Sequence, residues 1–441
     1  MDFSFSEDQN SIRELVKQVL TDLVTDDSLK ALAKEETWFH ERAWKQLAES
    51  EMLGLAIPEA YGGAGMGLTE LCLLLQQVGR TVAPIPAIET LVAAALPLAE
   101  FGTAEQKDRF LGGIAQGRTI VTPALVDAGS RDPMRPSAVA KAAGDGFRLS
   151  GRFSNVSYVD RADRILVPAR TDAGSVVVLL VDPTADGVRL GEQRGTNGQP
   201  LWSLELESTA VSEADVLGGP DRGTEVLRYL LDRTTLGICA VELGITEQAL
   251  FMTAKYSGER KQFGVPIGVF QGVTQRVGDA YIDVQAIRSS MWQACWRLDE
   301  GLDADKELAV AKFFASEAGA RVVAAAQHVH GGMGFDRDYP LYRYFMTSKH
   351  LEFTLGGTQE SLSRLGRLIS GRARKSLPGD RRVVRPTGPG REDEMKERLY
   401  STVRTTSACV TRDGVESFRR SRWQPCTLAP RPLRGSFPKW L

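Results

Sequence analysis

Apolar residues recur at helical spacing near the N-terminus of this 441-residue chain. A capping box of Ser6 and Gln9 predicts the start of the first helix, because each side chain can satisfy a backbone donor of the other residue. One face of that helix is apolar, formed by Ile12, Leu15, Val16, Val19, Leu20, Leu23 and Val24. The Gly-rich loop from Pro58 to Gly65 interrupts the pattern, and the apolar run at 91–98 resumes it. The pattern predicts a helical N-terminal domain over residues 1–121.

Between residues 122 and 220 the apolar period changes to two, which is typical of strands. The turn Gly144-Asp145-Gly146 precedes the alternating segment 147–149, residues 176–181 form a Val-rich run, and Leu and Glu alternate over 204–207. Short strands separated by frequent turn signals predict a small antiparallel β-barrel or sandwich as the middle domain.

Helical periodicity returns after the turn at 218–220 and continues to about residue 370. It falls into four long stretches, near 223–258, 269–300, 305–330 and 339–370. The first stretch is apolar nearly all the way round, as expected for a helix buried among its neighbours. Four such helices predict an antiparallel four-helix bundle over residues 221–372, and the fold class is α+β.

Charge is unevenly distributed along the chain. The whole sequence has 54 Lys and Arg against 56 Asp and Glu, whereas residues 372–441 alone have 17 against 7. That segment has no apolar periodicity and is rich in Arg, Pro, Gly and Ser, so we expect 373–441 to be a basic, disordered tail. The remainder carries a net charge of −12, which argues against nucleic acid as its main partner.

Targeting signals and metal-binding patterns are missing from the sequence. No stretch approaches the roughly 18 consecutive apolar residues of a membrane span, and the acidic first ten residues are unlike a signal peptide. We therefore expect a cytoplasmic protein without a membrane partner. The five cysteines form no CxxC pair and accompany only four histidines, so neither a disulfide framework nor a metal site is supported.

Four short motifs occur in order within residues 1–372. They are the loop from Pro58 to Gly65, the segment RKQFGVPIGVFQ from Arg260 to Gln271, the segment HGGMGF from His330 to Phe335, and the pair Gly357-Thr358. Each is weak alone, but together they resemble the acyl-CoA dehydrogenase family over almost the whole region. The resemblance implies a FAD-dependent oxidoreductase that forms an α,β double bond in an acyl-CoA thioester and passes electrons to electron-transfer flavoprotein.

The Arg260 segment has a chemistry that its residue types indicate directly. A guanidinium presents a planar fork of donors that suits phosphate oxygens, and an aromatic ring at Phe263 can stack on a flat ligand. The alternative is an arginine that is simply exposed at the end of a helix. The phosphate-binding interpretation is favoured over it only because the other motifs are present. By resemblance, Arg260, Phe263 and Gln271 contact the pyrophosphate and adenine end of a FAD that a neighbouring subunit mainly holds.

The glycine-rich segment after residue 330 offers a second contact. Gly331 and Gly332 have no side chains, so their backbone amides can approach a ligand closely; alternatively they only break a helix. By resemblance, His328 stands where the family contacts the flavin nucleotide across the dimer, and Thr358 joins the cofactor-binding set. We interpret His328 and His330 as packing or hydrogen-bonding residues rather than acid–base catalysts.

The family's catalytic carboxylate is missing from both of its usual positions. By resemblance, these positions fall at Gly356 and Thr234. Glu242 is the one acid in the apolar part of the same helix, and burial is expected to raise its pKa. It lies about 12 Å beyond Thr234 along the axis, so it is a weak candidate for the base; the alternative is a structural acid paired with an arginine such as Arg288.

The flavin-ring motif of the family is also reduced, because 125–130 keeps only Gly129-Ser130. Segments 281–284, 292–297 and 338–345 look like the companion subunits of actinobacterial steroid- and CoA-ester-degrading dehydrogenases of α2β2 composition. We therefore predict a companion subunit that completes the FAD site of a homologous, Glu-bearing catalytic subunit. Two alternatives stay open: a self-sufficient homo-oligomeric dehydrogenase that uses Glu242, and a non-redox relative that binds nucleic acid through its tail.

Overall fold

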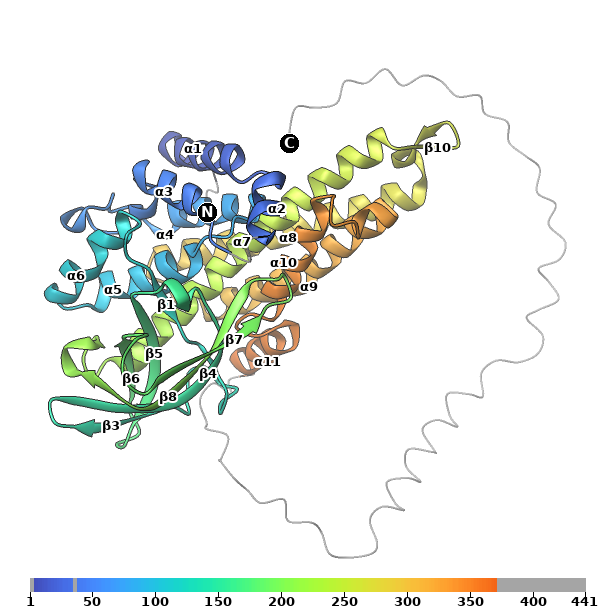
Figure 1. The fold of residues 1–441 in the computed structure, drawn as a ribbon. Coiled ribbons are helices and arrows are strands. Elements are labelled where there is room, and N and C mark those ends of the chain that lie inside the picture. The colour runs from blue at the N-terminus through green and yellow to red at the C-terminus, as the bar shows by residue number, and fades with distance from the viewer. Residues whose placement is uncertain (1–3, 35–37, 371–441) are drawn as a thin grey trace, which may run out of the picture. The chain divides into compact units, whose positions relative to one another are not determined.

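Helices, then strands, then longer helices follow one another along the chain in the computed structural model (Figure 1). The structure describes residues 4–34 and 38–370. The predicted α+β class is confirmed, with helices before and after a sheet. The predicted tail, 373–441, lies outside the described residues, so its disorder stays a prediction.

Short helices form the N-terminal part of the structure. The predicted capping box is present, since the Gln9 N–H donates to Ser6 Oγ at 3.1 Å and the Ser6 N–H donates to Gln9 Oε1 at 2.9 Å. The predicted apolar face is wrong at Leu15, which is 40% exposed because the buried stripe follows the i, i+4 row one position further on. The helical elements are α1 (Glu7–Leu23), α2 (Asp26–Lys34), α3 (Glu41–Glu49), η1 (Met52–Gly54), η2 (Glu59–Tyr61), α4 (Leu68–Thr81), the π-helical η3 (Ala87–Ala95), α5 (Leu96–Phe101) and α6 (Ala104–Ala115).

The middle of the chain forms one sheet with the strand order β7-β8-β4-β3-β5-β6-β9, to which β1 adds beside β5 and β2 beside β4. The predicted turn at 144–145 joins β3 to β4, and Leu204 and Leu206 point into the core as predicted. The strands are β1 (Val121–Pro123), β2 (Val126–Asp127), β3 (Val139–Ala143), β4 (Gly146–Ser157), β5 (Arg164–Thr171), β6 (Val176–Val181), β7 (Val188–Arg194), β8 (Pro200–Ser212) and β9 (Val216–Leu217), with the 3-10 turns η4 (Val159–Arg161) and η5 (Glu213–Asp215).

The prediction of a purely antiparallel sheet is wrong. Strands β1 and β3 both run parallel to β5. The reason is a crossover, because the chain leaves β4, passes β3 and enters the sheet on its other side as β5. Alternation of apolar and polar residues indicates that a segment is a strand, but it carries no information about the direction of the neighbouring strand.

Long helices form the C-terminal part, and the fourth predicted helix is in fact two. The break lies at 354–357, where Leu355 (φ +55°) and Gly356 (φ +95°) adopt left-handed backbone that cannot continue a helix. The elements are α7 (Gly223–Glu259), the hairpin strands β10 (Lys261–Gln262) and β11 (Val265–Pro266), η6 (Ile267–Val269), α8 (Gln271–Asp299), α9 (Asp305–His330), η7 (Gly331–Gly334), α10 (Leu341–Phe353) and α11 (Thr358–Ile369).

Helix α7 is the central element of the described structure. It packs against α4, η3, α8, α9, α10 and the strand β6. By length and composition alone it is the one described helix that is apolar enough to cross a membrane, yet 78% of its most apolar window is buried inside the protein. The apolarity of α7 is therefore explained by packing within the fold.

Helices α4 and α7 meet backbone to backbone at two glycines. A Cβ atom on Gly79 would overlap the carbonyl oxygen of Val241, and one on Gly244 would overlap the carbonyl oxygen of Gln76. No side chain larger than hydrogen fits at either position without moving a helix. The two glycines thus fix the distance between the N-terminal helices and the bundle.

We expect Gly244→Ala to lower the free energy of unfolding by about 1–3 kcal/mol, because the added methyl group overpacks this crossing. Gly258→Ala is the matched control, since it lies on the same helix with nothing near its Cβ position. In that control variant the free energy of unfolding should rise by up to about 1 kcal/mol, because alanine has a higher helix propensity than glycine. Urea unfolding measures both variants, and equal stabilities would contradict the close contact between α4 and α7.

Candidate functional site

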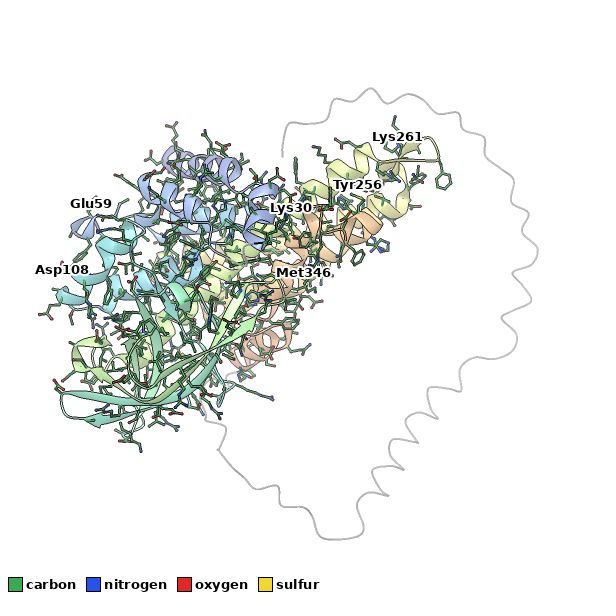
Figure 2. All side chains as sticks on the ribbon, in the orientation of Figure 1. Lys30, Glu59, Asp108, Tyr256, Lys261 and Met346 are labelled. Carbon is green, nitrogen blue, oxygen red and sulfur yellow. The ribbon has the colours of Figure 1, made fainter. Side chains whose placement is uncertain are left out.

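The Arg260 segment forms the far tip of the bundle. Helix α7 ends at Glu259, and the hairpin β10–β11 follows, with Lys261 at the end away from the sheet (Figure 2). The guanidinium of Arg260 makes no ion pair with a residue of the described ranges, and the Phe263 side chain is 94% exposed. Gln271, the first residue of α8, is also exposed. All three predicted contact residues therefore point away from the core.

The glycine segment lies at the same end of the bundle. The His330 ring, at the end of α9, stacks on Tyr256 near the end of α7 with ring centroids 4.3 Å apart. His328 is exposed, and nothing lies near the Cβ positions of Gly331 and Gly332. The stack thus places the end of α9 beside α7, one helical turn before Arg260.

Thr358 does not belong to this group. It begins α11, and its hydroxyl donates to Glu317 Oε2 at 3.3 Å in the middle of α9. From Glu317 to Gly331 the α9 axis runs about 21 Å at 1.5 Å per residue. Within one chain, therefore, Thr358 and the tip residues do not share a pocket.

The reduced flavin-ring motif forms a loop whose polar side chains make hydrogen bonds within the loop. The Asp127 carboxylate accepts from the Gly129 N–H at 2.8 Å and from the Ser137 N–H and hydroxyl, and Ser130 Oγ accepts from the Asp132 N–H at 3.2 Å. The loop borders an open groove of about 440 Å³ that also carries Glu205. The Asp127 carboxylate and the Ser130 hydroxyl are thus engaged within the loop itself.

Neither of the two positions that the resemblance predicts for the base carries a carboxylate. Thr234 is buried, and its hydroxyl donates to the Leu230 carbonyl at 2.7 Å. Gly356 has a φ of +95°, a conformation that L side chains rarely adopt. The Thr234 hydroxyl is thus engaged within its own helix, and the backbone at Gly356 disfavours any side chain.

Glu242 is buried, as predicted, with 1% exposure. Burial raises the pKa of Glu242 to about 8, and a hydrogen bond from Ser348 Oγ at 2.6 Å partly opposes that rise. The predicted pairing with Arg288 is wrong, because Arg288 binds Glu247 at 2.7 Å. Five residues rotate a helix by about 140° beyond a full turn, so Glu242 faces α9 and α10 while Glu247 faces α8.

Sequence patterns did not single out Glu89, which has a shifted pKa in the structure. Glu89 lies on the π-helical segment η3, where burial raises its pKa to about 7 and a hydrogen bond from Ser157 opposes the rise. A single acid just before an apolar run is the signal that marks it. It lies far from the tip residues in sequence and shares no contact with them in the structure described.

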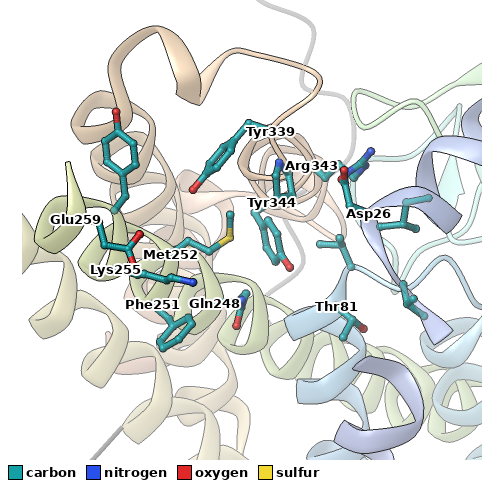
Figure 3. Close-up of a pocket in the computed structure, with 15 residues that line it drawn as sticks. Asp26, Thr81, Gln248, Phe251, Met252, Lys255, Glu259, Tyr339, Arg343 and Tyr344 are labelled. Carbon is teal, nitrogen blue, oxygen red and sulfur yellow. The ribbon is translucent and has the colours of Figure 1, made fainter. Parts of the chain in front are cut away.

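A cleft of about 500 Å³ was also not predicted (Figure 3). It lies between α2, the end of α4, the second half of α7 and the start of α10, with Tyr339 and Arg343 on one side. Arg343 is ion-paired with Asp26, and Gln248 Oε1 is a buried acceptor without a partner in the described residues. No local motif could reveal the cleft, because four separate elements form it.

Metal ligation is not indicated in the part of the chain that the structure describes. No group of three or more His, Cys, Asp or Glu side chains within 4–34 and 38–370 is placed to hold a metal ion.

Two protein-family models match this sequence. The model of the acyl-CoA dehydrogenase N-terminal domain matches residues 6–118, and that of the C-terminal domain matches residues 221–367. The chain belongs to the acyl-CoA dehydrogenase family. The predicted family is thereby confirmed, and the enzyme class is that of flavoprotein oxidoreductases acting on the CH–CH bond of an acyl-CoA.

Individual relatives within the acyl-CoA dehydrogenase family are similar over nearly their whole length. Acyl-CoA dehydrogenase FadE27 of Mycobacterium tuberculosis is 37% identical over 380 residues, which cover 84% of this chain and 99% of that protein. The structure of the ChsE4-ChsE5 complex from Mycobacterium tuberculosis matches with a TM-score of 0.80 at 38% identity, covering 84% and 99%. A variant of the Tcur3481-Tcur3483 steroid ACAD matches with a TM-score of 0.78 at 40% identity, covering 83% and 99%.

We expect Glu242→Gln to change how stability depends on pH. The folded pKa of about 8 lies above the ordinary value of 4.5, so folding binds a proton between these values, and the contribution of Glu242 to stability is lost as pH rises toward 8. The glutamine variant lacks this loss. Urea unfolding of both proteins at about pH 6 and about pH 9 measures the difference.

Ser348→Ala is the companion variant for this measurement. The Ser348 hydroxyl lowers the pKa of Glu242, so its removal should extend the loss of stability to higher pH while the loss still begins near the ordinary pKa of a glutamate. Parallel stability curves for wild type and Glu242→Gln would contradict the raised pKa.

Proposed function

We propose that this chain is the companion subunit of a FAD-dependent acyl-CoA dehydrogenase and completes the FAD site of a homologous catalytic subunit. The complex would oxidise a steroid-type acyl-CoA thioester to its α,β-unsaturated form and pass electrons to electron-transfer flavoprotein. Support for the pairing comes from the ChsE4-ChsE5 complex and support for the substrate class from the Tcur3481-Tcur3483 steroid ACAD.

One observation carries the proposal: the nucleotide contacts of this chain face outward. Arg260, Phe263 and Gln271 are exposed at the tip of the bundle, as are Gly331 and Gly332. In the loop around Asp127, by contrast, the carboxylate accepts hydrogen bonds from the Gly129 and Ser137 N–H groups of the same loop. Such a chain can supply half of a nucleotide site to a neighbour while having little with which to build a complete site of its own.

The residues at the tip fit the nucleotide half of FAD. The Arg260 guanidinium provides paired donors for pyrophosphate oxygens, and the exposed Phe263 ring provides a surface for stacking. The backbone at Gly331 and Gly332 can approach a ligand closely because no Cβ atom intervenes. When bound, FAD supplies the hydride acceptor of the reaction.

The base of the reaction would come from the catalytic partner. Glu242 is not favoured for this role, because it is 1% exposed and receives a hydrogen bond from Ser348 inside the bundle. A general base must reach the proton that it removes. Glu242 lines neither the cleft beside α2 nor the groove on the sheet.

The proposal predicts that activity requires two different chains. This chain purified alone should be colourless and should not reduce an artificial acceptor with a steroid acyl-CoA. Co-purified with a homologous dehydrogenase chain that carries the catalytic Glu, it should be yellow and active, whereas that partner alone should be inactive. A yellow, active homomer of this chain would overturn the companion role.

The same preparations separate the alternatives. If the homomer is active and Glu242→Gln abolishes that activity, the self-sufficient dehydrogenase is established. Deleting residues 373–441 should leave the activity of the complex unchanged. Loss of a steeply salt-dependent affinity for DNA on that deletion would instead support the nucleic-acid alternative.

Within the complex, we expect Arg260→Gln to weaken FAD binding about 10- to 100-fold, because a charge-assisted contact to phosphate is worth about 1.5–3 kcal/mol. Lys261→Gln is the control. It removes the same charge one residue further on, where a strand side chain points to the opposite side. Flavin fluorescence titration measures the FAD affinity of both variants. Equal losses of affinity would show that FAD binding depends on net charge rather than on the paired donors of the Arg260 guanidinium.

A further inference from the structure

His330, at the end of α9, is held on three sides. Its Nδ1 lies 2.8 Å from the Ala326 carbonyl oxygen, and its Nε2 lies 3.1 Å from the Tyr339 hydroxyl. The Tyr256 ring stacks on its face at 4.3 Å with an interplanar angle of 23°. The imidazole is 3% exposed, so the ring has one fixed position between α7, α9 and the segment before α10.

The two hydrogen bonds define the state of the imidazole. A carbonyl oxygen can only accept, so Nδ1 must carry the proton that it donates to Ala326. Burial lowers the pKa of His330 and favours the neutral ring. In that ring Nε2 is an acceptor, and the Tyr339 hydroxyl donates to it.

The position of His330 sets the start of the glycine loop η7. Gly331 follows directly, with a φ of +61° and a ψ of −132°, a conformation open essentially to glycine. At the other end of the loop, the Gln327 side-chain amide donates to the Gly334 carbonyl at 3.3 Å. The Gly331 N–H donates to the His328 carbonyl, so the loop is held between anchors on α9, with open space beside the Cβ positions of Gly331 and Gly332.

We propose that Tyr339, through its hydrogen bond to His330, positions the glycine loop Gly331–Gly334 for the nucleotide half of a FAD held on the partner subunit. This inference rests on the proposed companion function. Tyr339 is a positioning residue, because its hydroxyl is used by His330 and its ring faces the cleft beside α2 rather than the exposed tip (Figure 3).

The geometry explains why a tyrosine stands at this position. Helix α9 has ended at His330, and the backbone then turns through four residues of η7 of which three are glycines. Glycine loses more conformational freedom on folding than any other residue. A loop of this composition keeps one conformation only if its ends are fixed, and the Tyr339 hydroxyl fixes the end next to Gly331.

The test compares Tyr339→Phe with Tyr342→Phe in the complete two-chain complex. Both remove one hydroxyl from neighbouring positions, but the Tyr342 ring lies by Arg343 and contacts no part of the His330 group. We expect the FAD dissociation constant to rise about fivefold for Tyr339→Phe, in keeping with one lost hydrogen bond, and to stay within about twofold for Tyr342→Phe. Flavin fluorescence titration gives the constants, and urea unfolding gives the stabilities.

Variants of His330 separate positioning from packing. His330→Gln keeps one donor and one acceptor, whereas His330→Leu keeps neither. If the loop is positioned by hydrogen bonds, the glutamine variant should bind FAD more tightly than the leucine variant by about fivefold. If Tyr339→Phe and His330→Leu lower stability while leaving FAD affinity unchanged, the group only packs the bundle and the inference is overturned.

Arg260→Gln distinguishes a failure of this inference from a failure of the proposed function. If Arg260→Gln weakens FAD binding and Tyr339→Phe does not, the tip still contacts the nucleotide and only the positioning role is wrong. If neither variant changes FAD binding, the companion function fails and the positioning role fails with it.

Discussion

Glycine contacts on α7 are the constraint on which the rest of the fold depends. The carbonyl of Gln76 on α4 occupies the space beside Gly244, and the carbonyl of Val176 on β6 occupies the space beside Gly223. One helix is thereby locked to both the N-terminal helices and the sheet at main-chain distance. Because packed interiors tolerate little change in volume, this single helix sets how the three parts of the described structure meet.

The packing of α7 also explains why Arg260 is exposed. Helix α7 is buried densely as far as Leu250 and only sparsely afterwards, so its last turns extend beyond the packed core. The helix ends at Glu259, and Arg260 directly after it is exposed and makes no ion pair within the described residues. The stack of Tyr256 on His330 joins the end of α9 to this extension. Packing along the first part of α7 thus supports the exposed residues at its far end.

Periodicity predicted the helices and strands, because burial repeats along the chain with the period of each element. It failed where non-local geometry decides. The parallel placement of β5 depends on a crossover, and the exposure of Leu15 depends on which face α1 turns toward α4. The pairing of Arg288 with Glu247 rather than Glu242 depends on a rotation about α7 that no sequence spacing to α8 could specify.

The site shows the same division between local and non-local information. Motifs gave the residues of the tip, since each segment is contiguous in sequence. They could not show that Tyr339 holds His330, because that contact joins residues on either side of a glycine loop whose conformation is known only from the structure. The cleft beside α2 is assembled from four elements and left no sequence signal.

Both the backbone and its surroundings disfavour a side chain at Gly356. Gly356 has a φ of +95° and a Cβ there would meet the Glu360 side chain at 3.1 Å. Lys312, buried on α9, fixes the approach to this turn by donating to the carbonyls of Leu351 and Glu352 at 3.1 Å each. A glutamate at residue 356 would therefore require a change in the backbone turn in addition to the change of side chain. The turn therefore favours glycine at residue 356 over any residue with a Cβ atom.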